Sequence, residues 1–175
     1  TQKELRDKLG YVPQKGVLFS GTIDSNIRYG KPEITDAQVK EAAEVAQATE
    51  FIDTKPEKYE SPVSQGGTNV SGGQKQRLSI ARAIAKDPEI FIFDDSFSAL
   101  DFKTDSQLRK ALKEYTKDAT TVIVAQRIST ILGADQIIVL DDGHMAGIGT
   151  HKELMANCEV YQQIARSQLS EEELA

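Results

Sequence analysis

The stretch Asn69-Val-Ser-Gly-Gly-Gln-Lys-Gln-Arg-Leu78 decides how the rest of this sequence is interpreted. Ser71 stands three residues before Gln74, which is the spacing of a capping box and predicts the start of a helix. Gly72 and Gly73 leave the first free backbone N–H groups of that helix open to an anion such as a phosphate. An ordinary capped helix with two loop glycines is the alternative, because capping boxes are common.

The residues after this start predict a helix with one buried stripe, formed by Leu78, Ala81 and Ala85 with Ile84 beside them. Asp87-Pro88 predicts the end of the helix, because the residue before a proline disfavours helical backbone.

Patterns elsewhere in the chain predict alternating strands and helices. Apolar runs predict the strands, and a hydroxyl residue followed three positions later by Gln or Glu predicts a helix start. The expected strands are residues 10–14, 90–93, 120–125, 136–140 and 144–148, and the expected helices are residues 35–48, 104–117 and a last helix from Thr150. This alternation predicts an α/β fold with a largely parallel sheet.

The central string also resembles a family motif. Ser71-Gly72-Gly73-Gln74, followed by Gln76-Arg77 and Ala81-Arg82-Ala83, resembles the signature motif of ATP-binding-cassette (ABC) ATPases. In that family the motif closes over the γ-phosphate of ATP that a partner domain holds. The resemblance therefore implies that Ser71, Gly72, Gly73 and Gln74 contact ATP held by a partner, and that this partner is a second nucleotide-binding domain.

Two loops extend the resemblance. Tyr11-Val-Pro-Gln14 looks like the Q-loop, in which the Gln reaches Mg²⁺ and the attacking water and the loop couples to a membrane domain. Gln14 is thereby implied as a nucleotide and metal contact, and transmembrane coupling helices as a partner. Pro62-Val-Ser-Gln-Gly-Gly67 sits where exporters carry the X-loop, with Gln65 in place of the usual Glu; a Gly-rich linker is the alternative. Leu18-Phe-Ser-Gly-Thr-Ile23 resembles exporters in particular.

The apolar run Ile90–Phe93 ends in two adjacent carboxylates, Asp94 and Asp95. A continuous apolar run fits a parallel strand buried on both faces, and ligands of such sheets bind outside the carboxyl ends of the strands. A turn is the alternative. The run resembles the Walker B motif, which implies that Asp94 holds Mg²⁺ through water. Ser98-Ala-Leu-Asp101 resembles the D-loop and implies Asp101 as a nucleotide contact.

The chain contains no Gly-x-x-x-x-Gly-Lys-Ser/Thr string; Thr22 follows Gly21 where the lysine of a Walker A motif is required. The resemblance implies a P-loop NTPase (RecA-like) sheet with an ABC helical subdomain, and the absent string implies that the fold is truncated at the N-terminus so that the Walker A strand is missing. The expected parts are a Q-loop strand (residues 1–14), a helical subdomain with the signature helix (15–86) and a RecA-like part with Walker B, D-loop and switch loop (87–175). Such a chain on its own should have little or no ATPase activity.

The resemblance places the missing strand between the strand that ends at Gln126 and the strand at 137–140. Unpaired inner edges of a sheet invite pairing with other chains. We therefore expect the isolated chain to close the gap by rearrangement or to fill it from another copy.

Two departures from the family fall on catalytic positions. Asp95 stands where the family usually has Glu as the general base, and the missing methylene withdraws the carboxylate by roughly 1–1.5 Å. Gln126 stands where the family has the switch histidine, and an amide cannot carry a proton as imidazole does. In the complete protein, both would face ATP bound to the expected Walker A motif of the same chain, which residues 1–175 do not include. The expected protein is therefore one half of a heterodimeric, multidrug-type ABC exporter, with a degenerate ATP site of its own and an intact signature for the partner's site.

Composition limits the alternatives. The 175 residues, 39% hydrophobic and 27% charged, suit a globular domain, and no run approaches the ~20 apolar residues of a membrane helix. A net charge of −6 argues against a nucleic-acid partner. We expect a peripheral domain at the cytoplasmic face of the cell membrane. A non-transport ABC ATPase and a regulatory nucleotide-binding module are the alternative functions.

Overall fold

Helix α5 (Gly72–Ala85) is the element on which the first part of the chain is built, and it begins where the capping box predicts. Ser71 Oγ accepts the Gln74 N–H at 3.2 Å, and Gln74 Oε1 accepts the Ser71 N–H at 3.1 Å. The four residues of the predicted stripe, Leu78, Ala81, Ile84 and Ala85, are buried as expected, and the burial extends beyond them. Helix α2 (Ile23–Ile27), helix α3 (Asp36–Val45) and strand β1 (Leu9–Val12) all contact α5. It is therefore buried on most sides, at Gln76, Leu78, Ser79, Ile80, Ala81, Ala83, Ile84 and Ala85.

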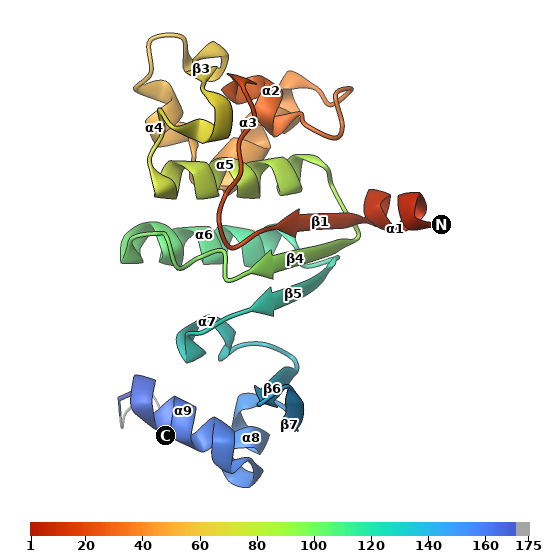
Figure 1. The fold of residues 1–175 in the computed structure, drawn as a ribbon, viewed down its shortest axis with the longest axis vertical. Coiled ribbons are helices and arrows are strands. Elements are labelled where there is room, and N and C mark those ends of the chain that lie inside the picture. The colour runs from red at the N-terminus through yellow and green to blue at the C-terminus, as the bar shows by residue number, and fades with distance from the viewer. Residues whose placement is uncertain (171–175) are drawn as a thin grey trace. The chain divides into compact units, whose positions relative to one another are not determined.

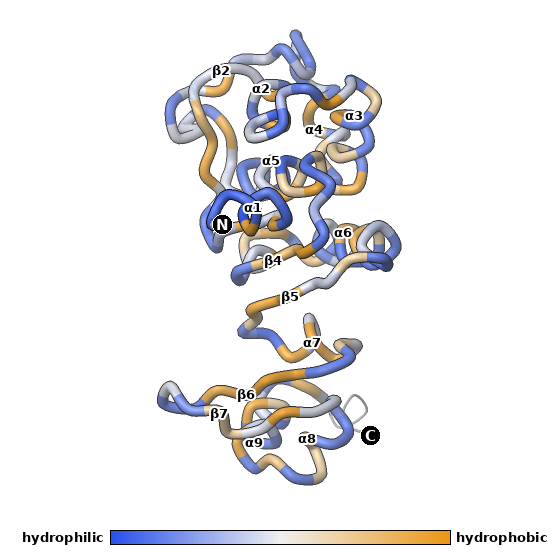
Figure 2. Tube along the Cα trace, turned by 90° about the vertical axis from the view of Figure 1, so that its right-hand side faces the viewer, coloured by the Kyte–Doolittle hydropathy of each residue, from blue (hydrophilic) through white to orange (hydrophobic). Residues whose placement is uncertain are grey.

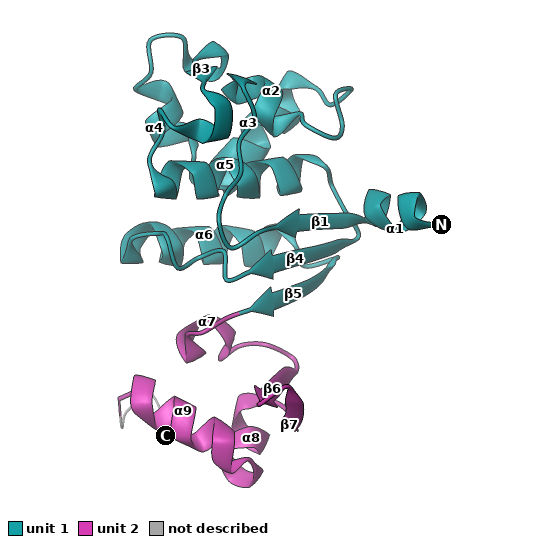
Figure 3. Cartoon of the chain, in the orientation of Figure 1, with its two compact units in different colours: residues 1–124 teal, residues 125–175 magenta. Residues whose placement is uncertain are grey.

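The computed structural model describes residues 1–170, and the chain forms two compact units, residues 1–124 and residues 125–175 (Figure 3). The predicted boundaries near residues 14 and 86 stay predictions, since they divide the chain by function rather than by compactness.

A three-stranded parallel sheet lies beside α5 in the first unit (Figure 1). Its order is β1, β4 (Ile90–Asp94) and β5 (Thr120–Val124), and Val12 pairs with Phe93 across the first two strands. Figure 2 shows the apolar runs of β4 and β5 next to each other. Phe91 and Phe93 are buried, but the alternate residues of β4 are only half-buried. The prediction of burial on both faces was therefore wrong for the described residues.

The remaining elements of the first unit are short. Helix α3 ends three residues before its predicted end, because Gln47 adopts a left-handed backbone (φ 56°) that a helix cannot continue through. The other elements are α1 (Gln2–Lys8), β2 (Gly21–Thr22), α4 (Thr49–Asp53), η1 (Lys58–Glu60), β3 (Pro62–Val63) and η2 (Gln65–Gly67).

Helix α6 (Phe102–Tyr115) corrects a predicted helix start. The capping residue is Asp101, whose Oδ1 accepts the Thr104 N–H at 3.0 Å, so the helix begins before Thr104 rather than after it. An Asp three residues before Thr competes directly with the Thr104–Gln107 pattern, and the carboxylate is the better acceptor for free helix N–H groups.

The second unit contains a hairpin and three helices among its described residues. Strands β6 (Ile137–Asp141) and β7 (His144–Gly149) pair antiparallel through the predicted Asp142-Gly143 turn, at which both residues have positive φ. The helices are α7 (Ile128–Ile131), α8 (His151–Asn157) and α9 (Glu159–Gln168). The single last helix expected after Thr150 is in fact two, because Cys158 has an extended backbone.

No helix in the described range 1–170 is long and apolar enough to cross a membrane.

Candidate functional site

Two loops meet at the carboxyl ends of β1 and β4. Gln14 lies two residues after the end of β1, and Asp95 directly follows β4. Gln14 Nε2 donates a hydrogen bond to Asp95 Oδ2 at 3.0 Å. The parallel pairing of β1 with β4 is what brings the two side chains together, although 81 positions separate them in the chain. Both are residues for which the sequence predicts a role in ATP chemistry.

The backbone of Asp95 is held on both sides. Its φ of 43° lies in the left-handed region, where Asp is tolerated better than most residues because its short side chain can bond locally. Its N–H donates to the Val124 carbonyl at 2.9 Å, at the end of β5, and its carbonyl accepts the Ser98 hydroxyl at 3.0 Å. These contacts fix the position of the Asp95 backbone, so the distance from that backbone to the carboxylate depends on the length of the side chain.

Asp94 has a partner that the sequence did not indicate. Tyr11 Oη donates to Asp94 Oδ2 at 3.0 Å, and this hydrogen bond is the main reason that the pKa of Tyr11 is raised above its ordinary value of 10.0. The contact depends on which residues of β1 and β4 lie side by side. Nothing in either strand's own sequence reveals that register, so the sequence analysis missed Tyr11.

The predicted metal ligands supply suitable chemistry for a magnesium ion. The Asp94 carboxylate and the Gln14 side-chain carbonyl are hard oxygen donors, the kind that Mg²⁺ prefers. Residues 1–170 contain no group of three or more His, Cys, Asp or Glu side chains placed to hold a metal. Mg²⁺ is usually bound by one or two carboxylates together with waters and phosphates, so the residues present fit that ion rather than a fully protein-ligated one.

The start of α5 offers an open backbone. A Cβ added to Gly72 would meet nothing within 4 Å, whereas one added to Gly73 would lie 3.5 Å from the Ala99 carbonyl and 3.8 Å from Leu100. The glycines of the signature string thus lie beside the predicted D-loop on one side and leave space on the other. This arrangement suits the approach of an anion to the free N–H groups of a 14-residue helix.

Asp101 caps α6 in this structure, as described above. The Thr104 N–H holds the pKa of the Asp101 carboxyl below its ordinary value of 3.8, so the group is a carboxylate at neutral pH. Its predicted role as a nucleotide contact stays a prediction.

Gln126 belongs to the second unit, where its carbonyl accepts Gln168 Nε2 at 2.9 Å. The prediction that it faces the same ATP as Asp95 stays a prediction.

Gln76 is a second residue that the sequence analysis missed. Its side chain is 1% exposed and bonds to the loop that carries Gln14, from Nε2 to the Pro13 carbonyl at 3.0 Å and from the Gly16 N–H to Oε1 at 2.8 Å. A signal was present, because Gln76 precedes Ile80 and Ile84 at helical spacing. A polar residue in line with such an apolar stripe must find partners when it is buried.

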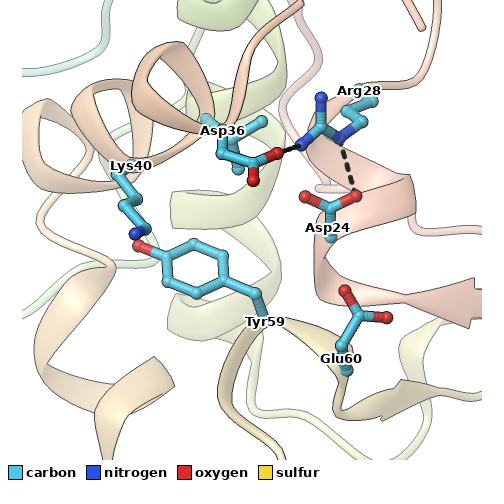
Figure 4. Close-up of a pocket in the computed structure, with 7 residues that line it drawn as sticks. Asp24, Arg28, Asp36, Lys40, Tyr59 and Glu60 are labelled. Carbon is cyan, nitrogen blue, oxygen red and sulfur yellow. Dashed lines mark hydrogen bonds and ion pairs between the residues drawn. The ribbon is translucent and has the colours of Figure 1, made fainter.

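A hollow of about 240 Å³ lies elsewhere in the first unit, between α2, α3 and the segment around Tyr59 (Figure 4). Arg28 occupies one wall, with Nε 2.7 Å from Asp24 Oδ2 and Nη2 2.5 Å from Asp36 Oδ1. It also donates to the Ile34 carbonyl. The guanidinium is used in joining α2 to α3, so the hollow is lined by a structural ion-pair network.

Comparisons with known proteins agree on one family. Residues 1–98 match the family described as "ABC transporter". The chain is 46% identical over 169 residues to an uncharacterized ABC transporter ATP-binding protein of Mycobacterium tuberculosis (strain H37Rv), covering 95% of this chain and 29% of that protein. It is 46% identical over 160 residues to a putative multidrug export ATP-binding/permease protein of Staphylococcus aureus (strain NCTC 8325), covering 91% of this chain and 28% of that protein.

A solved structure gives the same result for the fold. A bacterial Atm1-family ABC exporter with ATP bound superimposes with a TM-score of 0.93 at 40% identity, covering 98% of this chain and 30% of that one. The expected fold, a P-loop NTPase sheet with an ABC helical subdomain, is confirmed. The chain spans about three tenths of the length of the curated relatives that it matches.

Proposed function

The chain belongs to the ABC transporter family, and from this premise we propose that it is the ATP-binding domain of an exporter, acting as an ATPase at the cytoplasmic face of a membrane. The observation that carries the proposal is the 3.0 Å hydrogen bond between Gln14 and Asp95, because it joins an expected contact of Mg²⁺ to the expected base. The relative named as a putative multidrug export protein and the exporter structure with ATP bound support a role in export.

The residues divide the chemistry of ATP hydrolysis among them. Asp94 and Gln14 would hold Mg²⁺, which when bound would supply positive charge to the phosphates. Asp95 accepts a proton from the attacking water. The start of α5, at Ser71–Gln74, donates backbone N–H groups to the γ-phosphate of ATP on a partner domain, where the helix dipole favours negative charge.

This chain's own site is the weaker of two. The carboxylate of Asp95 is set back by roughly 1–1.5 Å relative to Glu, and a misplacement of about 1 Å can slow a reaction about a hundredfold. Gln126 can hydrogen-bond a phosphate oxygen but cannot shuttle a proton. The signature string has no such weakness, so the working site is the one that it completes on a partner. We infer a heterodimer with a non-identical second subunit, whose transmembrane domain contacts this chain through coupling helices.

Steady-state ATP hydrolysis by the complete protein, purified without a partner, tests the proposal. We expect a nearly silent wild type and a marked gain, of about a hundredfold, in the double variant Asp95→Glu/Gln126→His. The matched control Asp95→Asn/Gln126→His should stay silent, because it has the histidine but no base.

Each other outcome has a clear meaning. A wild type that already hydrolyses ATP at the rate of its restored variant would show a self-sufficient homodimer and refute the degenerate site. Silence in both proteins, with nucleotide still bound, would favour a regulatory nucleotide-binding module over an ATPase.

A further inference from the structure

We propose that Gln76 is a positioning residue that fixes the loop Pro13–Gly16 and, through Gln14, the carboxylate of Asp95. The inference rests on the proposed function in one respect, since it takes Asp95 as the base of this chain's ATP site. It adds a connection, because Gln76 lies on the same helix as the signature string. The base of one site would therefore be tied to the helix that contacts ATP in the other.

Gln76 holds both ends of the loop with one side chain. Its Nε2 donates to the Pro13 carbonyl at 3.0 Å, before Gln14, and its Oε1 accepts the Gly16 N–H at 2.8 Å, after it. The side chain is 1% exposed, so water does not compete for these bonds. A primary amide offers a donor and an acceptor at once, which a carboxylate, a thioether or an alkyl group does not.

The loop also lies directly on the backbone of α5. A Cβ added to Gly16 would be 2.8 Å from both the carbonyl carbon and the oxygen of Lys75, and 2.9 Å from Ser79 Oγ. These distances are shorter than ordinary contacts, and two of the three atoms belong to helical backbone that cannot turn aside. The loop therefore moves with α5 rather than over it.

The last link is the side chain of Gln14. It leaves the clamped loop and donates to Asp95 Oδ2 at 3.0 Å, while the Asp95 N–H is held separately by the Val124 carbonyl at 2.9 Å. A loop shift of little more than 0.5 Å would stretch the Gln14–Asp95 bond beyond hydrogen-bonding distance. The path from α5 to Asp95 thus consists of two parallel hydrogen bonds between Gln76 and the loop, followed by one from Gln14 to Asp95. Together with the packed contacts, these bonds are a physical route for coupling between two sites.

The test compares Gln76→Met with a matched control, Asn26→Leu. Met has nearly the shape of Gln but cannot make the two bonds. Asn26 is another buried amide, 1% exposed, whose Nδ2 donates to the Phe19 and Thr22 carbonyls at 2.9 Å without touching the loop. Asn26 Oδ1 also accepts the Phe19 N–H and Arg82 Nη2 at 2.9 Å, so Asn26→Leu loses four side-chain hydrogen bonds and Gln76→Met loses two. The control is therefore the harsher case of general destabilisation, and an effect confined to Gln76→Met does not come from destabilisation alone.

Amide hydrogen exchange reports on the clamp directly. In the complete complex, purified with its partner, we expect the Gly16 amide to exchange about tenfold faster in Gln76→Met, as the loss of one hydrogen bond implies. In Asn26→Leu the same amide should change by less than about twofold. An unchanged Gly16 exchange rate in Gln76→Met would overturn the proposal.

Single-turnover hydrolysis of labelled ATP reports on the transmission to Asp95. The proposed function predicts a fast phase from the partner's site and a slow phase from this chain's site. Gln76→Met should slow the slow phase about tenfold and leave the fast phase within about twofold, whereas a general defect slows both. In a Gln14→Ala background, Gln76→Met should add no further slowing. Full additivity with Gln14→Ala would overturn the proposed route.

Amide exchange and single-turnover hydrolysis distinguish a failure of this proposal from a failure of the proposed function. Hydrolysis with a single phase in the wild-type complex would refute the unequal sites. The Gly16 exchange rate then decides the clamp alone: acceleration in Gln76→Met upholds it and no change refutes it.

Discussion

Replacing Gly16 with Ala should destabilise the chain through one unavoidable contact. The added Cβ would lie 2.8 Å from the backbone of Lys75, and ordinary contact begins at 3.4 Å, so the loop must withdraw by about 0.6 Å. The same shift lengthens the 2.8 Å bond from the Gly16 N–H to Gln76 Oε1 to about 3.4 Å, where it is weak. Overpacking of this kind typically costs about 1–3 kcal/mol.

Thermal unfolding followed by circular dichroism measures this change. For a chain of this length, a loss of about 1–3 kcal/mol corresponds to a fall in Tm of about 3–9 °C. Gly133→Ala is the control, because a Cβ there meets nothing within 4 Å and the residue does not have a positive φ. Its Tm should stay within about 2 °C of the wild type.

A Gly16→Ala protein as stable as Gly133→Ala would refute the reasoning. It would mean that the loop has room to move away from α5 without loss, and the rigid connection between them would not exist. Slower hydrolysis at this chain's site should accompany the destabilisation, because Gln14 lies in the displaced loop.

Two further predictions concern charged side chains. The hydrogen bond from the Thr104 N–H lowers the pKa of the Asp101 carboxyl below its ordinary value of 3.8. The carboxylate therefore stabilises the folded chain fully at pH values above 3.8. This contribution is lost as the pH falls through the lowered pKa. Asp101→Asn should therefore unfold at a lower temperature than wild type at pH 7 but at the same temperature near pH 2; a constant difference would contradict this. Arg82 donates to the Asn26 and Val17 carbonyls at 2.8 Å, and burial lowers its pKa to about 10. Lysine has no guanidinium with which to reach both carbonyls, so Arg82→Lys should lower the free energy of unfolding in urea by about 1–3 kcal/mol. The exposed control Arg6→Lys should leave that free energy unchanged. Equal urea midpoints for the two variants would refute this.

Local patterns predicted the starts of helices well because a capping box acts over four residues. Ser71 and Thr35 both cap their helices as their sequences indicate. The same reasoning misplaced the start of α6, since two acceptors, Asp101 and Thr104, compete within one turn and the sequence does not say which the backbone selects. Helix ends were less predictable, because the left-handed residue Gln47 carries no glycine signal.

Some residues of the candidate site were singled out from the sequence, and others became evident only from the structure. Gln14, Asp94 and Asp95 were singled out because their strings resemble the Q-loop and Walker B motifs of the ABC family, and their roles stay predictions. The sequence did not identify Tyr11 or Gln76, whose partners are 83 and up to 63 positions away.

The sequence by itself determined the family, the alternation of strands and helices, and the two unusual residues Asp95 and Gln126. These follow from local strings whose chemistry is independent of distant parts of the chain. Tertiary structure alone decided the strand register that joins Tyr11 to Asp94, and the packing that lets Gln76 hold the loop of Gln14. Such contacts form only when segments far apart in the chain are brought within about 3 Å, and a linear pattern carries no record of that distance.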